Sequence, residues 1–337
     1  MRFDSLFFKN YGNFTEILFF KNEVIMSFET QNPLLPKGER IHPAIVLVIL
    51  LLSILFFLLI GSGLMLLLLG ANGVGLDEIA TLLTDASTIR ERNLFRTTIM
   101  IQHLAMFVIP SLVVGYFVYQ KAWLSKLSLK NFPEVNTWGL GILIMLAAFP
   151  LVAASSWLNM QIDLPEWARM LEDDTQEQIK QMLKTEAPYE LLFNLFIVAV
   201  IPAVGEELVF RGFLQKRLGE LLDNPHIAVW LAAFIFSAIH FQFEGFLPRF
   251  LLGALLGYLL VWTKNLWVPI IAHFFFNGSQ ILAQYFSPEE ANMELENMNE
   301  LDLPIWASVI AVGLSVVIVF ALGKKLQELH TDSTNMV

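Results

Sequence analysis

Three charged residues interrupt an apolar run of the sequence: the adjacent carboxylates Glu206 and Glu207, and the arginine Arg211. A charged side chain in the middle of a bilayer costs at least ~2.5 kcal/mol on insertion scales, so three in one segment indicate partners and a function. In a helix, Glu207 and Arg211 share a face and permit an ion pair, whereas Glu206 is rotated by about 100°. Neighbouring carboxylates do not ionise together easily in a low-dielectric site, which favours one glutamate as a general base. A structural Glu–Arg clamp between helices is the alternative.

Further polar residues lie downstream in apolar segments. His240 follows one such segment, and His273 and Asn277 are four residues apart in another, which places imidazole and amide on one helix face. Polar groups inside a bundle must face one another or water, so we expect these side chains to converge with the charged segment. His103, in an earlier apolar segment, is interpreted as a hydrogen-bonded packing residue.

The combined carboxylates, imidazoles and amide suit activation of a water molecule for attack on a peptide carbonyl. A glutamate takes the proton, and imidazole or amide donors, or a metal that they hold, stabilise the oxyanion. The chain has no cysteine, which excludes thiolate nucleophiles and disulfides. The cofactor is open: a divalent metal such as zinc is an alternative, although an amide is a poor zinc ligand. Its candidate ligands are Glu206, His240, His273 and Asn277.

Three motifs in this order resemble those of a known family. The sequence reads Glu-Glu-x-x-x-Arg, then Phe-x-x-x-His, then His-x-x-x-Asn, each in a separate apolar segment, at Glu206 to Arg211, Phe236 to His240 and His273 to Asn277. This pattern resembles the CPBP family (CAAX protease and bacteriocin-processing enzymes, also called Abi) of intramembrane proteases. The resemblance covers roughly residues 191–286.

The resemblance also implies roles. Glu206 would be the base that activates water, assisted by His240, while His273 and Asn277 would face the scissile carbonyl. The second glutamate and the arginine of the first motif would orient the site. Family members are often classed as metalloproteases, yet the same residues can work without metal as a glutamate-dependent site.

Composition places these residues in a membrane protein. Of the 337 residues, 56% are hydrophobic and 15% are charged, against about 25% charged in soluble proteins. Mean hydropathy is +0.61. The formal net charge of -10 predicts no nucleic-acid partner. The partners to expect are the lipid bilayer and a peptide or protein substrate at the membrane.

The predicted fold is an all-α polytopic bundle of about eight transmembrane spans, with a catalytic helix set in the C-terminal half. A tail, 1–43, precedes a region of three spans, 44–190. Its last part, 159–190, is predicted to be an amphipathic helix that could cover the active site, with a solvated loop helix as the favoured interpretation. Residues 191–286 form a protease-like core, and 287–337 hold a final span and a tail.

The charge distribution orients the spans. Lysines and arginines precede the first span and follow every second one, whereas the loops after the third and seventh spans are acidic. This asymmetry predicts both termini in the cytoplasm and a location in the cell (inner or plasma) membrane.

Two other functional classes stay open. A proton- or ion-coupled transporter could use the same polar cluster as a relay, although the sequence shows no convincing internal repeat. A non-catalytic immunity or scaffold protein could keep the charged residues for packing. Peptide cleavage, ion-dependent uptake or neither would separate the three.

Overall fold

The computed structural model describes residues 41–75, 78, 83–84, 87–286 and 305–335. These residues form helices joined by turns and loops, with no strand among them, which confirms the all-α prediction. Most of the predicted tail 1–43, and the acidic loop that opens the predicted region 287–337, lie outside the described residues.

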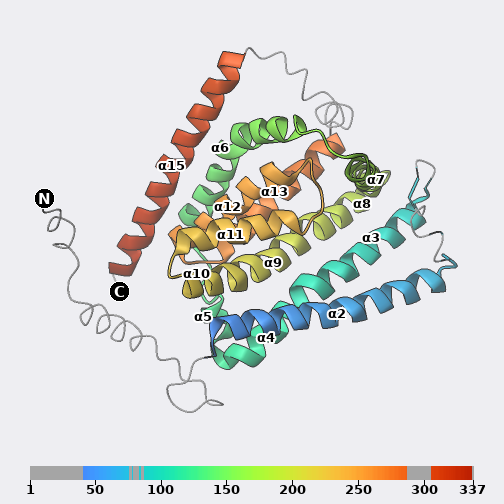
Figure 1. Ribbon diagram of the computed structural model, residues 1–337, viewed down its shortest axis with the longest axis horizontal. Coiled ribbons are helices and arrows are strands. Elements are labelled where there is room, and N and C mark those ends of the chain that lie inside the picture. Colours follow the sequence, from blue (N-terminus) through green and yellow to red (C-terminus); the bar gives the residue numbers. More distant parts are fainter. Residues whose placement is uncertain (1–40, 76–77, 79–82, 85–86, 287–304, 336–337) are drawn as a thin grey trace, which may run out of the picture. The chain divides into compact units, whose positions relative to one another are not determined.

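Among the described residues, six helices are long and apolar enough to cross a membrane (Figure 1). They are α2 (Pro43–Ala71), the continuous rod Ile89–Lys126, α6 (Val135–Met160), the continuous rod Pro188–Leu222, α12 (Phe246–Thr263), and the part Trp306–Leu329 of α15 (Ile305–Asn335). The chain is therefore a polytopic integral membrane protein, as its hydropathy predicts.

The predicted fifth and seventh spans are helices too, but they fall outside this set of six. α11 (Pro225–Ala238) has 14 residues, which reach only about 21 Å at 1.5 Å per residue, short of the ~30 Å of hydrocarbon. α13 (Trp267–Phe286) has 20 residues, and polar side chains such as His273 and Asn277 lower its hydropathy. α13 is thus less like an ordinary span than its neighbours, whereas the rod that carries the two glutamates is one of the six.

The rod Pro188–Leu222 changes its winding along its length. It runs through α8 (Pro188–Asn194), the π-helical segment η4 (Leu195–Val200), α9 (Ile201–Glu207), a second π-helical segment η5 (Leu208–Gln215) and α10 (Lys216–Leu222). Its apolar window is 61% buried, against 17% for α2, so this rod is the central element. The two glutamates lie between the π-helical segments, which are rare and often mark functional sites.

A glycine sets the distance between α9 and the rod Ile89–Lys126. That rod begins with α3 (Ile89–His103) and continues through η2 (Leu104–Val108), which contacts α9. A Cβ atom at Gly205 would lie 2.8 Å from Phe107 Cβ and 2.9 Å from Val108 Cγ2. Only glycine permits this approach, which brings the end of α3 beside the glutamates.

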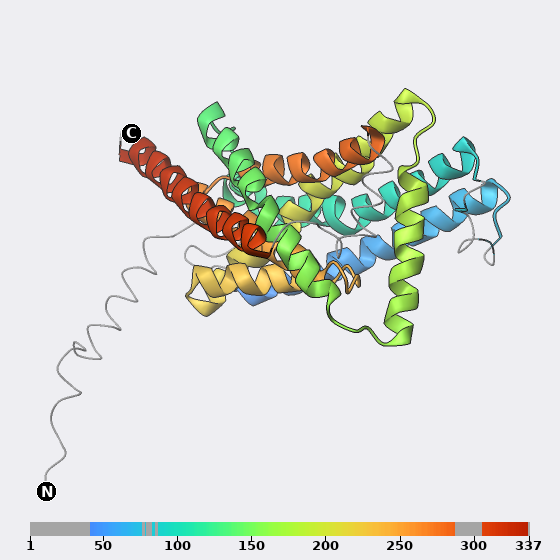
Figure 2. The same cartoon turned by 90° about the horizontal axis from the view of Figure 1, so that it is seen from above.

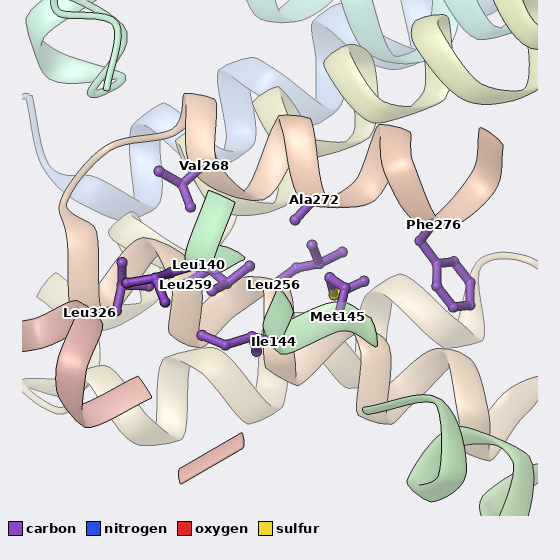
Figure 3. Packing of buried hydrophobic residues seen from close by; sticks show 9 residues of the cluster. All are labelled: Leu140, Ile144, Met145, Leu256, Leu259, Val268, Ala272, Phe276 and Leu326. Carbon is purple, nitrogen blue, oxygen red and sulfur yellow. The ribbon is translucent and has the colours of Figure 1, made fainter. Parts of the chain in front are cut away.

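An apolar core lies on the other side of the site. Helices α6, α12, α13 and α15 meet there, and Figure 3 shows their side chains interdigitating. The buried members are Leu140, Ile144, Met145, Leu256, Leu259, Val268, Ala272, Phe276 and Leu326. Since a close-packed core resists displacement, it fixes α13, and with it the side chains that α13 directs toward α9.

The helix α7 (Glu166–Leu183) corresponds to the predicted amphipathic segment; most of its residues are exposed, and a buried carboxylate attaches it to the turn after α11. It is seen nearly end-on in Figure 1 and lengthwise in Figure 2, so it crosses the direction of α3. Glu172 of α7 is 3% exposed and accepts hydrogen bonds from the backbone N–H groups of Phe243 (2.8 Å) and Glu244 (3.4 Å). Hydropathy patterning did not show this clamp, because its buried contact residue is a carboxylate.

The C-terminal end of α7 is held by a buried ionic network. Arg96 of α3 donates to the backbone oxygens of Met182 and Lys184, both at 2.7 Å, and to Glu190 Oε1 at 2.6 Å. Arg92 pairs with the same Glu190 oxygen at 3.4 Å. Arg92 also pairs with Glu186 Oε1 at 3.2 Å. The network ties α3, α7 and α8 together.

Candidate active site

Four of the six predicted site residues line one cavity of about 850 Å³. They come from three places: Glu206 from α9, His240 from the turn after α11, and His273 and Asn277 from α13. Glu206 is only 4% exposed, whereas the side chain of His103, which lines the same cavity, is 28% exposed. The cavity therefore connects a buried carboxylate with the molecular surface.

The Glu206 carboxylate lies between two imidazoles. Its Oε1 is 3.6 Å from His103 Nε2, and its Oε2 is 3.9 Å from His273 Nε2. Both distances exceed the 2.7 to 3.2 Å typical of a direct hydrogen bond. The carboxylate is thus surrounded by rings that can carry positive charge but is not locked to either, which leaves its lone pairs able to accept a proton.

Glu207 has a different environment, although it is the next residue. It is fully buried, and its Oε1 accepts from Arg211 Nη1 at 2.7 Å and lies 2.9 Å from His273 Nδ1. A carboxylate that already accepts from arginine can only accept from the imidazole, so Nδ1 carries the hydrogen. The His273 Nε2 atom is thereby directed toward Glu206.

Arg211 completes this clamp. Its Nη2 donates to the backbone oxygen of Gly253 at 2.8 Å, and its guanidinium lies 4.8 Å from the centre of the Phe236 ring. The predicted ion pair between Glu207 and Arg211 is confirmed. Glu207 and Arg211 do not line the cavity that contains Glu206. The two glutamates therefore lie in different environments.

His240 lies in a turn rather than inside a helix, because α11 ends at Ala238. Its Nδ1 is 2.7 Å from the backbone oxygen of Phe236. A carbonyl oxygen only accepts, so Nδ1 donates and Nε2 of the neutral ring is the acceptor. The following residue, Phe241, has a φ of 52°, an uncommon conformation for a bulky side chain that turns the chain sharply after His240.

Asn277 faces both the cavity and the central rod. Its Nδ2 donates to the backbone oxygen of Val198 in η4 at 3.1 Å. An amide nitrogen has two hydrogens, so one donor stays available on the cavity side. The contact fixes the register of α13 against η4.

Two residues of this cavity escaped the sequence reasoning. His103 was interpreted as a packing residue. Its Nε2 atom lies 3.6 Å from Glu206 Oε1, closer than the His273 Nε2 atom, which lies 3.9 Å from Glu206 Oε2. Its signal was available: an ionisable side chain inside an apolar span is a functional candidate by default. Arg249, near the start of α12, gave no signal because it stands outside the three motifs.

The donor set does not fit a metal in this arrangement. The described residues contain no group of three or more His, Cys, Asp and Glu side chains placed to hold an ion. Zinc needs its ligands at about 2.0 to 2.3 Å from one point, whereas the Glu206 oxygens diverge toward different imidazoles.

Comparisons with known proteins agree on this part of the chain. Residues 188–279 match the family model described as type II CAAX prenyl endopeptidase Rce1-like. That segment contains all three motifs, from Glu206 to Asn277.

Two curated relatives match over a similar length. The uncharacterized protein YpbD of Bacillus subtilis is 35% identical over 108 residues, covering 31% of this chain and 50% of the relative. The membrane-embedded CAAX protease MroQ of Staphylococcus aureus is 31% identical over 110 residues, covering 31% of this chain and 44% of the relative. The chain thus spans about half the length of the curated relatives it matches.

No solved structure matches the chain. The family model, the protease relative and the motif residues gathered around one cavity all concern the same segment. This segment resembles the CPBP family, the family that the three motifs indicated.

Proposed function

We propose that the protein is an intramembrane endopeptidase in which Glu206 activates a water molecule for attack on a peptide carbonyl. One observation carries the proposal: a buried carboxylate that no neighbour locks in place lines a cavity together with three imidazoles and an amide. A structural carboxylate, such as Glu190, has its oxygens occupied by donors. Among the described residues, the imidazole nitrogens that pair with Glu206 lie 3.6 and 3.9 Å from its oxygens, beyond the usual range of a direct hydrogen bond, so the carboxylate can act on water.

The reaction balances with the residues present. The water oxygen bonds to the carbonyl carbon while its proton passes to Glu206, assisted by the Nε2 acceptor of His240. The tetrahedral oxyanion is stabilised by the second Nδ2 hydrogen of Asn277, and by His273 when its Nε2 atom also carries a hydrogen. The proton then moves to the leaving nitrogen, and the C–N bond breaks.

The substrate is a peptide segment at the membrane, cut in CAAX-type or leader-type processing. Support comes from the family match and from the setting of the cavity among apolar helices. Within this proposal, residues 191–286 form the protease core. The preceding region contributes His103 and the cavity-lining face of α7, which includes Thr175, Gln178 and Ile179.

A paired substitution tests the proposal. Glu206→Gln keeps the size of the side chain and removes the base, so we expect kcat to fall by about 10²- to 10⁴-fold. Glu220→Gln on the same rod is the matched control, since Glu220 is exposed and only pairs with Arg217. The assay is cleavage of lipid-tethered peptides by the purified full-length protein, followed by mass spectrometry.

Thermal unfolding of both variants checks that they are folded, and metal analysis with a chelator series runs alongside. Full cleavage by folded Glu206→Gln would remove Glu206 from the mechanism. If the chelator abolishes cleavage and metal analysis finds one metal ion per chain, the water would be activated with the help of a metal and not by Glu206 alone.

A further inference from the structure

Arg249 is a cation in the cavity with an unused donor. It lines the cavity with Glu206 and His240, and its Nη2 donates to Gln242 Oε1 at 2.5 Å. Its Nη1 is shielded from solvent and has no hydrogen-bond partner among the described residues. An unmade hydrogen bond at a buried charged group is costly, so an arginine held this way indicates a missing acceptor.

In contrast to Arg249, the fully buried arginines among the described residues have ion-pair partners. Arg92 and Arg96 pair with Glu190, and Arg211 pairs with Glu207. Each also donates to at least one backbone oxygen. Arg249 differs from these three arginines, and it lines the cavity that contains Glu206. Arg217 also has a buried nitrogen without a partner among the described residues, Nε, but it does not line this cavity.

The nearby carboxylates do not supply the missing partner. The charges of Glu172 and Glu206 act on Arg249, but neither forms an ion pair with it in the described residues. Glu172 accepts from the backbone of the turn that follows His240. Glu206 is directed toward His103 and His273.

Gly245 leaves space for the Arg249 guanidinium. A Cβ atom at Gly245 would lie 2.6 Å from Arg249 Nη2. Any side chain at position 245 would push the guanidinium out of its present place. The space at Gly245 and the Gln242 hydrogen bond together fix where the Arg249 guanidinium lies beside the cavity.

We propose that Arg249 binds a carboxylate group of the peptide substrate, which deepens the proposed function and rests on it. Arginine presents a planar fork that matches a carboxylate, and a charge-assisted bond in a water-poor cavity gives both affinity and register. The carboxylate can be a free C-terminus or an acidic side chain next to the scissile bond. In either case, Arg249 selects where along the peptide Glu206 acts.

The test measures binding separately from cleavage. Three lipid-tethered peptides share one sequence containing a single Asp: one has a free C-terminal carboxylate, one is amidated, and one has Asp replaced by Asn. Their Kd values are measured by fluorescence anisotropy on full-length Glu206→Gln protein, which does not consume them. We expect the peptide lacking the recognised carboxylate to bind about 10- to 100-fold more weakly than its counterpart.

Substitution of the arginine should abolish this preference. In Arg249→Gln, the Kd ratio between the carboxylate peptide and its neutral counterpart should fall to within about twofold, and Arg249→Lys, which keeps charge without the fork, should give an intermediate ratio. Gly245→Ala should lower the ratio with Arg249 still present. Arg217→Gln is the matched control, because Arg217 pairs with Glu220 away from the cavity, and should leave the ratio unchanged.

The outcomes are separable. A ratio that is the same with and without Arg249, or equal weakening of charged and neutral peptides, would overturn the assignment. If Arg249→Gln does not fold, the Arg249→Lys and Gly245→Ala ratios decide. A preserved Arg249-dependent preference with no hydrolysis by the wild-type protein would instead refute the proposed function and keep the carboxylate site.

Discussion

The clamp formed by Arg211, Glu207 and His273 makes a prediction in which stability and activity separate. Glu207 Oε1 lies 2.7 Å from Arg211 Nη1 and 2.9 Å from His273 Nδ1, and all three side chains are buried. Replacing one member of a buried ion pair leaves the other charge unpaired, which costs about 3 to 5 kcal/mol. Glu207→Leu and Arg211→Met should each destabilise the protein by about that amount.

The double variant should be much more stable than the sum of the two single changes. Removing both charges removes the unpaired-ion penalty, and apolar replacements of a buried pair are often close to neutral. What is left is the cost of two unmet bonds, at His273 Nδ1 and at the Gly253 oxygen, of about 1 to 3 kcal/mol each. Additive single penalties would reach about 6 to 10 kcal/mol, against about 2 to 6 kcal/mol for the two unmet bonds, so the midpoints of these ranges give a coupling of about 4 kcal/mol.

Activity should not follow stability. His273 loses its orienting acceptor in Glu207→Leu and in the double variant alike, and a misplaced catalytic group costs on the order of 10²-fold in rate. The assays are denaturant or thermal unfolding in detergent and kcat/KM for peptide cleavage, on all four proteins of the cycle. Recovery of cleavage together with stability in the double variant would refute the positioning role of Glu207, and additive stabilities would refute the ion-pair reasoning.

Two further outcomes test how the site is assembled. Gly205→Ala places a Cβ against Phe107 and Val108. Overpacking of this kind costs about 1 to 3 kcal/mol and should move His103 away from Glu206, so both the unfolding midpoint and kcat/KM should fall. If neither value changes, the two helices separate without cost and the close approach does not position His103. His103→Ala should lower kcat/KM by about tenfold with little change in the unfolding midpoint, because the ring is partly exposed; a large loss of stability with normal cleavage would return His103 to a packing role.

The parts of the fold that follow from local periodicity were predictable. Long apolar runs give the spanning helices, and the spacing of four residues gives the Glu207–Arg211 pair, because both depend only on helix geometry. The acidic segment before residue 190 was predicted to be a helix for the same reason, and α7 is one.

Contacts between distant elements were not predictable in the same way. The position of His103 beside Glu206 depends on the close approach at Gly205, which no spacing reveals. The cover that α7 provides depends on Glu172 meeting two backbone N–H groups 71 and 72 residues away. Glu206 and Glu207 have different surroundings because Glu207 pairs with Arg211 of its own rod, whereas Glu206 faces a cavity that other helices also line.

The turn after His240 links these long-range contacts into one mechanical unit. Asn159 of α6 donates to the Phe243 oxygen and accepts from the Leu247 N–H group, both at 2.7 Å, while Glu172 of α7 holds the other side of the turn. The turn that contains His240 and Gly245 is therefore held in place by α6 and α7, two helices that contain no motif residue. Because the proposed binding to Arg249 and the proposed proton transfer near His240 would both depend on this turn, a substrate that moves α7 should alter recognition and chemistry together.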